Sequence, residues 1–458
     1  MGSLSGALAI ALGALGADDG AVAITANNIA NVQTPGYSRE QVNFAPNPPL
    51  QLGNLQLGTG VSLEQTTHIR DTLLDFRLDQ ENQTSSQLAA FLGPLNQAQA
   101  LFNETSGSGL QAPLTAFFNS LQQLSDNPSS SALREGVITA GQNLASSIRQ
   151  DTANLQSLQN NADLGVQQSV TQINTLSSEI AALNVQISGL VGAKQDAGTF
   201  IDQRTQLVQQ LSGLIGISQT PAENSSLTIS TANGQSLVVA GQSFALQTQI
   251  NPQTGFHDVF TQSADITSVI TGGTIGGQIQ VRDQEIPSIL NKLDTFAFGL
   301  ASAVNAQSKL GFDANGNAGV NFFNIPAAAA GTASSISVAI TNPDLVAASS
   351  DGTIGSNGNA QALVNLQNAK VVAGQTPANY YDALVFQIGN DVSQANAEQT
   401  SVSLVQQQLQ NQQGSISGVS LDEEAANLIR FQSAYQASAH VVTVIDTLLA
   451  TVINMAAS

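Results

Sequence analysis

LDEEAANLIRFQSAYQASAHVVTVIDTLLATVINM, residues 421–455, forms one long helical pattern that carries two apolar stripes. One stripe contains Leu421, Ala425, Leu428, Tyr435, Ala439, Val442 and Leu449. The other contains Phe431, Ala434, Val441, Ile445, Leu448, Val452 and Met455. Together the stripes make an apolar face wider than one partner helix can cover. Charge gathers at the start of the helix, in Asp422, Glu423 and Glu424, where it suits the helix dipole.

The opposite end of the chain predicts a second amphipathic helix over about the first 32 residues. Its apolar positions are Leu4, Leu8, Ala11, Leu15, Val22, Ala26 and Ile29. The long step from Leu15 to Val22 spans Asp18-Asp19-Gly20, which predicts a weakened middle. Thr34-Pro35-Gly36-Tyr37 has the Pro-Gly order of a type II turn and ends the helix. The two terminal helices either pair with each other in an ordinary bundle or pack against copies of the chain, and the apolar pattern alone leaves both open.

Between the ends, the sequence predicts long helices around a β module. Helical spacing runs from about residue 69 to 212, again over 286–304, and again over the last hundred residues. Residues 214–281 change to strand-like alternation, with Asn233-Gly234 as a hairpin turn and Asn251–Gly255 as another. The stretch 311–359 is rich in Gly, Asn and Ala and has one predicted strand at Ser335–Ile340.

We therefore expect a mainly α chain with an inserted β module, organised as nested domains. Residues 1–66 and 414–458 would form a coiled-coil-like terminal assembly domain. Residues 67–213, 282–310 and 360–413 would form a helical bundle. A small β-rich outer domain would take 214–281 and 311–359.

The composition excludes several classes of function. The 458 residues include 12 Lys+Arg and 32 Asp+Glu, a net charge of −20 that argues against nucleic acid and anionic membranes. The sequence has no Cys, which removes disulfides, thiol nucleophiles and Cys-ligated metals. No apolar run reaches the length of a membrane span, and the first basic residue, Arg39, lies too late for a signal peptide. The protein is thus either cytosolic or exported without a cleaved signal.

Catalytic and metal-binding patterns are missing, so we predict no enzyme activity, cofactor or metal. His68, His257 and His440 are far apart, although Glu64 and Asp71 flank His68 at the spacing of a helical ion pair. Gly272–Gly277 is Gly-rich without a phosphate-binding spacing, and we expect a turn there. Asp313–Asn317 opens like a calcium loop but lacks the later Gly and Glu ligands, which favours a polar turn.

Both ends resemble known signatures. Residues 26–39, ANNIANVQTPGYSR, resemble the N-terminal motif of bacterial flagellar axial proteins, the rod, hook and hook-associated proteins. Residues 418–439, GVSLDEEAANLIRFQSAYQASA, resemble their C-terminal motif. The interior segments 271–282 and 300–316, and the turn with the helix that follows it at 127–134, are similar to the hook-associated protein 1 (FlgK) family. The chain looks short for that family, which predicts a reduced outermost domain.

The resemblance implies a structural protein of the hook–filament junction that assembles through its terminal helices. It implies unfolded export through the flagellar type III apparatus and an extracellular location. The implied partners are copies of the chain, in a ring or short helical layer, with hook protein below the layer and the second junction protein FlgL above it. An export chaperone would bind the C-terminal helix. The resemblance implies no binding of nucleic acid and no insertion into a membrane. Cys-free, charge-poor surfaces are compatible with export and side-by-side packing.

We expect the assembly residues to lie in the two signatures, with Tyr37 and Arg39 as candidates for contacts between subunits. The full predicted set is Asn27, Asn28, Asn31, Pro35, Gly36, Tyr37, Arg39, Leu421, Leu428, Phe431, Tyr435, Val442, Ile445 and Leu449. Two alternatives remain: another axial protein of the hook or distal rod, and an extracellular adhesin whose residues 214–281 bind a glycan. Long helical patterns at 130–190 and 284–309 argue against the first, because those relatives have mainly β interiors.

Overall fold

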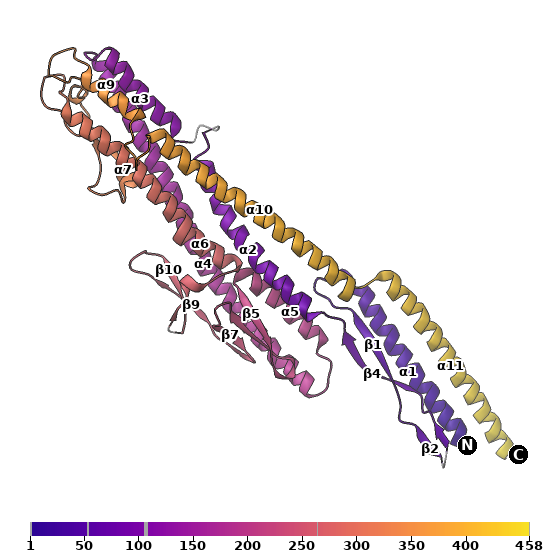
Figure 1. Cartoon of the computed structure of the whole chain (residues 1–458). Coiled ribbons are helices and arrows are strands. Elements are labelled where there is room, and N and C mark those ends of the chain that lie inside the picture. Colours follow the sequence, from indigo (N-terminus) through magenta and orange to yellow (C-terminus); the bar gives the residue numbers. More distant parts are fainter. Residues whose placement is uncertain (1, 53–54, 105–108, 263, 458) are drawn as a thin grey trace. The chain divides into compact units, whose positions relative to one another are not determined.

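The computed structural model describes residues 2–52, 55–104, 109–262 and 264–457 (Figure 1). The chain divides into two compact units. The terminal unit comprises Met1–Gln83, Ile173–Ala245 and Ser403–Ser458, and the central unit comprises Thr84–Gln172 and Leu246–Val402. Helices α2 (Thr72–Leu101), α4 (Ser131–Gly192) and α10 (Pro377–Ser417) contribute residues to both.

The terminal unit contains the first and last helices, α1 (Gly2–Ala30) and α11 (Leu421–Ala457), packed against each other. Small buried side chains on α1, Ala11, Ala17 and Ala21, allow close packing on that helix. The predicted weakening at Asp18–Gly20 is wrong, because α1 is continuous there. Gly20 is needed for contact instead, since a Cβ at this position would lie 2.8 Å from the Leu63 side chain.

Extended segments follow α1, as predicted. Strands β1 (Glu40–Pro46) and β4 (Val61–His68) pair antiparallel, with Glu40 opposite His68, and β2 (Leu50–Leu52) pairs with β3 (Leu55–Leu57). His68 therefore ends a strand, so the helical spacing of Glu64 and Asp71 around it does not make an ion pair on a helix.

The remainder of the terminal unit combines helix and sheet. Helix α5 (Gly198–Leu214) leads into a four-stranded sheet of order β5-β6-β7-β8. Its strands are Ile217–Pro221, Leu227–Thr231, Ser236–Val239 and Gln242–Ser243, with the 3-10 turn η2 at Glu223–Ser225. The predicted Asn233-Gly234 hairpin is confirmed: it joins β6 and β7, and Gly234 has a φ of 87°.

The central unit is built on an apolar helical core. Aromatic side chains from separate helices meet in it, including Phe117, Phe296 and Tyr381, each fully buried. Besides parts of α2, α4 and α10, its helices are α3 (Gln111–Asp126), α6 (Gly273–Gln280), η4 (Val281–Glu285), α7 (Ile286–Leu310), α8 (Thr332–Ser335) and α9 (Gly358–Asn365), with short turns η3 (Thr267–Val269), η5 (Pro343–Leu345) and η6 (Leu366–Asn368). Its strands are β9 (Leu246–Ile250), β10 (His257–Thr261), β11 (Ala264–Asp265), β12 (Phe323–Asn324) and β13 (Ser337–Val338). The mainly helical fold with an inserted β module is confirmed.

Several local predictions need correction. Gly273–Gly277 lies in helix α6 rather than in a turn. The strand expected at Ser335–Ile340 is reduced to Ser337–Val338, and 311–359 consists mostly of irregular chain instead of a β-rich fold. The polar turn at Asp313 is confirmed, because its Oδ1 accepts hydrogen bonds from the backbone N–H groups of Asn315 and Asn317, both at 2.8 Å. The three nested domains stay a prediction, which limited proteolysis would test.

Two helical stretches are long and apolar enough to cross a membrane by length and composition, within Leu4–Ala30 and within Pro377–Met455. The expectation that no stretch reaches that length is therefore wrong. Length and composition alone are weak evidence for a span, because helices that pack on protein pass the same criteria.

Candidate assembly site

The N-terminal signature ends in a tight turn whose geometry requires glycine. The N–H of Tyr37 donates to the carbonyl of Thr34 at 3.2 Å, and Gly36 has a φ of 73°. A Cβ on Gly36 would also lie within 3 Å of the Gln206 side chain, which donates to the Pro35 carbonyl. The predicted turn is confirmed, and it packs directly on α5.

Asn28 organises this turn from within α1. It is 1% exposed, and its side-chain oxygen accepts from the hydroxyl of Tyr37 at 2.8 Å and from the N–H of Glu40 at 2.9 Å. Its Nδ2 donates to the Glu40 carbonyl at 2.9 Å. Burial and the charge of Glu40 raise the pKa of Tyr37, so this phenol stays protonated. Asn27 and Asn31 support the same turn from the exposed side, through bonds from Asn27 to Glu40 and from Asn31 back to Asn27.

The two signatures meet in an ion-pair cluster that we call the terminal clasp, formed by Asn28, Arg39, Glu423 and Glu424. Arg39 Nε lies 2.7 Å from Glu424 Oε1, and its Nη1 lies 2.7 Å from Glu423 Oε2. Asn28 Nδ2 donates to Glu424 Oε2 at 3.2 Å. Glu424 is 2% exposed whereas the Glu423 side chain is 61% exposed, so Glu424 is the carboxylate that depends on these donors.

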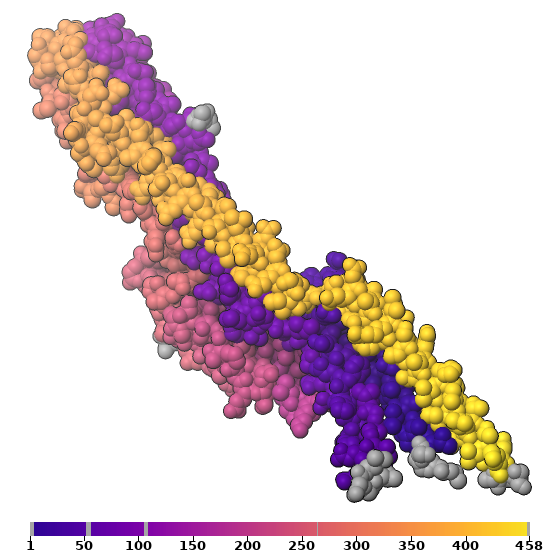
Figure 2. Space-filling view, turned by 45° about the vertical axis from the view of Figure 1, so that its right-hand side comes forward, coloured from indigo at the N-terminus to yellow at the C-terminus, as the bar shows by residue number. Residues whose placement is uncertain are grey.

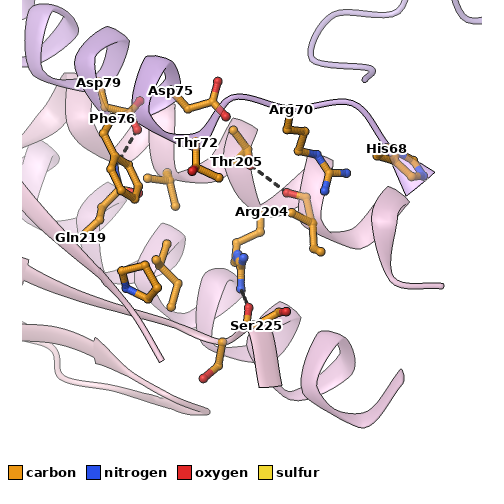
Figure 3. Close-up of a pocket in the computed structure, with 15 residues that line it drawn as sticks. His68, Arg70, Thr72, Asp75, Phe76, Asp79, Arg204, Thr205, Gln219 and Ser225 are labelled. Atoms are coloured by element: carbon orange, nitrogen blue, oxygen red, sulfur yellow. Dashed lines mark hydrogen bonds between the residues drawn. The ribbon is translucent and has the colours of Figure 1, made fainter. Parts of the chain in front are cut away.

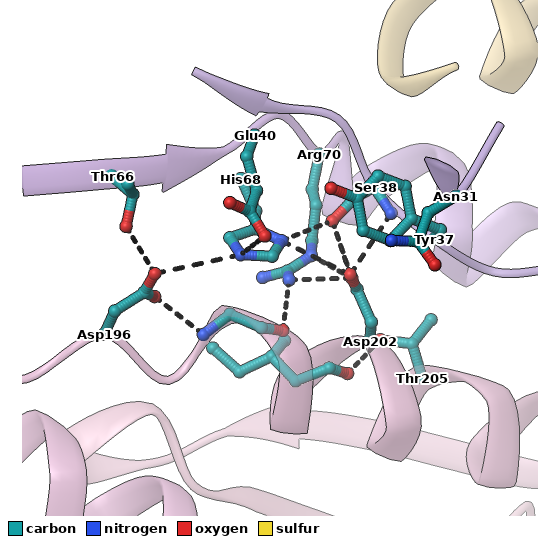
Figure 4. A network of polar contacts seen from close by, with 12 residues as sticks. Asn31, Tyr37, Ser38, Glu40, Thr66, His68, Arg70, Asp196, Asp202 and Thr205 are labelled. Atoms are coloured by element: carbon teal, nitrogen blue, oxygen red, sulfur yellow. Dashed lines mark hydrogen bonds and ion pairs between the residues drawn. The ribbon is translucent and has the colours of Figure 1, made fainter. Parts of the chain in front are cut away.

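A second cluster, the Asp202 hub, ties the N-terminal signature to α5 (Figure 4). Asp202 accepts from the Ser38 hydroxyl at 2.7 Å and from Arg70 Nε at 2.8 Å, and lies 3.3 Å from His68 Nδ1. Burial alone would raise the pKa of Asp202, but hydrogen bonds from His68 and Ser38 and the charge of Arg70 bring it below its usual value. The hub thus holds β4 and the turn of the signature on one buried carboxylate.

The hub does not have the geometry of a hydrolytic triad. Ser38 and Asp202 both approach the same ring nitrogen of His68, while the other nitrogen, Nε2, is buried without a hydrogen-bond partner among the described residues and lies 3.6 Å from Glu40 Oε1. A triad needs the base between the nucleophile and the orienting acid. Over the part of the chain that the structure describes, no group of three or more His, Asp or Glu side chains could hold a metal ion.

Helix α11 separates its apolar residues into a covered and an open face. The residues that face the chain are at least half-buried and mix both predicted stripes: Leu428, Phe431, Ala434, Val442, Ile445 and Leu449. Phe431 also contacts the ring of Phe44 on β1, with centroids 6.0 Å apart. The exposed residues flank this covered face on two sides: Leu421 and Tyr435, 52% and 37% exposed, on one, and Val441, Leu448 and Val452, 38–48% exposed, on the other. We call these five residues the outward face. Figure 2 shows α11, in yellow, with open surface along its length.

The predicted assembly residues therefore fall into two groups. The first-signature residues converge on the clasp and the turn, and Tyr37 and Arg39 are engaged within the chain. Of the α11 residues, Leu421 and Tyr435 lie on the outward face, and the others pack inward. Sequence reasoning missed Ser38, His68, Arg70, Asp202 and Glu424. A lone Arg39 in a chain so poor in basic residues, together with the acidic run at 422–424, was the available signal for the clasp.

Comparison with known proteins gives one consistent family. The family model "Flagellar hook-associated protein FlgK helical domain" matches residues 95–323. "Flagella basal body rod protein" matches residues 8–37, and "Flagellar basal body rod FlgEFG protein C-terminal" matches residues 412–455. The last two ranges contain most of the clasp and the whole outward face.

Curated relatives match over nearly the whole chain. Flagellar hook-associated protein 1 of Bacillus subtilis is 31% identical over 96% of each sequence, and that of Escherichia coli is 28% identical over 97% of this chain and 98% of its own. The alignment to the latter spans 541 positions, more than the 458 residues here, so the relative carries segments that this chain lacks. The structure of the flagellar hook junction protein FlgK from Burkholderia pseudomallei superposes on 74% of this chain and all of that one, with a TM-score of 0.67 and 18% identity.

Proposed function

The chain belongs to the family of flagellar hook-associated protein 1 and is a structural component of the bacterial flagellum, and from this premise we propose that it assembles into the hook–filament junction through the outward face of α11. The observation that carries the proposal is that α11 has only Glu424 and Ile445 fully buried among its described side chains, while its apolar residues continue around the helix. Val441, Leu448 and Val452 follow one another at steps of seven and four and so form one exposed apolar stripe, and such a patch is typical of a protein–protein interface. Repeated head-to-tail packing of such faces gives a ring or a short helical layer.

The terminal clasp has a separate role in this proposal. It fixes the start of α11 to the N-terminal signature, so that α1 and α11 reach a neighbouring subunit as one preformed pair. Preorganisation lowers the entropy that each subunit must lose on assembly. The apolar stretches of α1 and α11 then serve packing between subunits rather than a membrane span.

The remaining partners follow from family membership. Hook protein would lie below the layer and FlgL above it. Before type III export, a chaperone would hold the C-terminal helix, because an uncovered apolar helix promotes aggregation. The hook and distal-rod alternatives are set aside, since full-length similarity is to hook-associated protein 1.

The test is a pair of charge substitutions on the outward face, Leu448→Asp with Val452→Asp. We expect the variant to be secreted and folded, with an unchanged melting temperature, but to leave hooks without filaments. Leu164→Asp on α4, at a residue that is 55% exposed, is the matched control and should support filament growth. Normal filaments on the double variant would overturn the proposal.

A further inference from the structure

The terminal unit contains a cavity of about 310 Å³ that the assembly role leaves unused (Figure 3). It lies among the start of α2, helix α5, strand β5 and the segment 225–227. Its apolar lining includes Phe76, Ile201, Val208 and Leu227. Charged and polar side chains, among them Arg204 and Asp79, line the same cavity. Apolar walls with polar groups that can orient a ligand are typical of a site for a small organic molecule.

Arg204 lines the cavity as a buried cation without a counter-ion among the described residues. Arg204 is 8% exposed, and its Nη1 donates to Asn184 Oδ1 at 2.8 Å and to the Ser225 carbonyl at 2.7 Å. Within the described ranges, its Nε and Nη2 have no hydrogen-bond partner and no carboxylate pairs with it. Burial lowers the pKa of Arg204 to about 10, and the nearby charge of Arg70 adds to the effect. An uncompensated guanidinium with free donors favours binding of a carboxylate, which it can hold by two parallel bonds.

Two acidic side chains, Asp75 and Asp79, also line the cavity. Asp79 is 5% exposed and accepts from Gln219 Nε2 at 2.7 Å, and Asp75 lies one helical turn before it. No described cation pairs with Asp79, and it forms no ion pair with Arg204 although both line the same cavity. One cavity thus offers an anion receptor and, apart from it, a carboxyl group that can accept from a donor.

We propose that this cavity binds a small organic carboxylate with an unbranched apolar body and an amino group at its far end. The carboxylate takes the free donors of Arg204, the body contacts Phe76 and Val208, and the amino group faces Asp75 and Asp79. Because the lining comes from α2, α5 and β5, such a ligand would fasten these elements together.

The direct test is calorimetry on the full-length protein with 6-aminohexanoate, hexanoate and 1-hexanol as probes. We expect affinity to fall in that order, with at least a tenfold step from hexanoate to hexanol, because the alcohol lacks the charge that Arg204 needs. Equal affinity for hexanoate and hexanol, or binding of neither carboxylate, would overturn the proposal.

Variants locate the site. Arg204→Met should reduce hexanoate affinity at least tenfold, whereas Arg77→Met, which removes the same charge from the exposed face of α2, should leave it unchanged. Because Arg204 also donates to the Ser225 carbonyl, Ile201→Phe is the second variant: the larger side chain fills part of the cavity, keeps Arg204, and should abolish binding without loss of helical signal. Full affinity in a folded Ile201→Phe protein would contradict this location.

Discussion

The core of the central unit and the outward face of α11 use the same kinds of side chain for opposite purposes. Phe117, Phe296 and Tyr381 are fully buried within one chain. Val441 and Leu448 are 47% and 48% exposed, although their sequence pattern is as apolar. The central unit completes its own core, whereas α11 has apolar surface left for a partner. Periodicity in the sequence therefore reveals an apolar face but not whether the same chain covers it.

The largest expected effect on stability comes from the central core. Phe117→Ala should lower the free energy of unfolding by about 4 kcal/mol, because it leaves a cavity among Phe118, Phe322 and Phe323. Chemical denaturation measures the loss. Leu448→Ala on the outward face should cost less than ~1 kcal/mol in the isolated protein, and equal losses would break the comparison.

Breaking the terminal clasp should give the next largest loss in the free energy of unfolding. Arg39→Ala leaves the buried Glu424 with only Asn28 as a donor, and we expect a loss of about 3 kcal/mol. Hydrogen exchange at the start of α11 should rise more than exchange in α3. An unchanged exchange rate over residues 421–428 would show that the clasp does not hold the helix.

Asp79 should make a smaller contribution to the free energy of unfolding, and this contribution depends on pH. Burial raises the pKa of Asp79 to about 7, so the folded protein holds this proton more tightly than the unfolded chain does. Stability that depends on Asp79 is therefore full below about pH 4 and is lost as pH rises toward 7. Asp79→Asn should remove this loss, on the order of 2 kcal/mol at pH 8 relative to pH 4. Thermal unfolding of both proteins across that range provides the comparison, and parallel pH profiles would contradict it.

The exposed ion pair of the clasp, between Arg39 and Glu423, should contribute least to the free energy of unfolding. Glu423→Gln removes an ion pair at a side chain that is 61% exposed, and we expect ~0.5 kcal/mol or less. Comparison of Glu423→Gln with Arg39→Ala separates the contribution of the buried Arg39–Glu424 pair from that of the exposed Arg39–Glu423 pair. A loss as large as that of Arg39→Ala would mean that Glu423, not Glu424, carries the clasp.

Much of the fold was predictable from local sequence, because helix periodicity, the Asn233-Gly234 hairpin and the Thr34–Tyr37 turn each act over a few residues. The errors arose where tertiary contact overrides local preference. Gly20 looked like a weak point of α1 but is a contact with β4, and Gly273–Gly277 folds as helix where Gly277 packs closely on α2. A Cβ on Gly277 would lie 2.3 Å from the Gln87 carbonyl.

The candidate site was predictable only in part. The signatures gave its location, but the clasp joins residues 385 positions apart, from Arg39 to Glu424. Asp202 lies in an α5 segment with no signature of its own, so nothing local marks it as the partner of Ser38. The sequence also did not reveal which α11 residues face α1, because the covered face contains residues from both predicted stripes.

The most direct test of the central claim is the accessibility of the outward face before and after assembly. The sequence contains no Cys, so Val441→Cys provides a single thiol for maleimide labelling. We expect rapid labelling in the isolated protein and a rate at least tenfold slower in purified hook–junction particles. Equal rates in both states would contradict it, because the outward face of α11 would then stay open in the assembled flagellum.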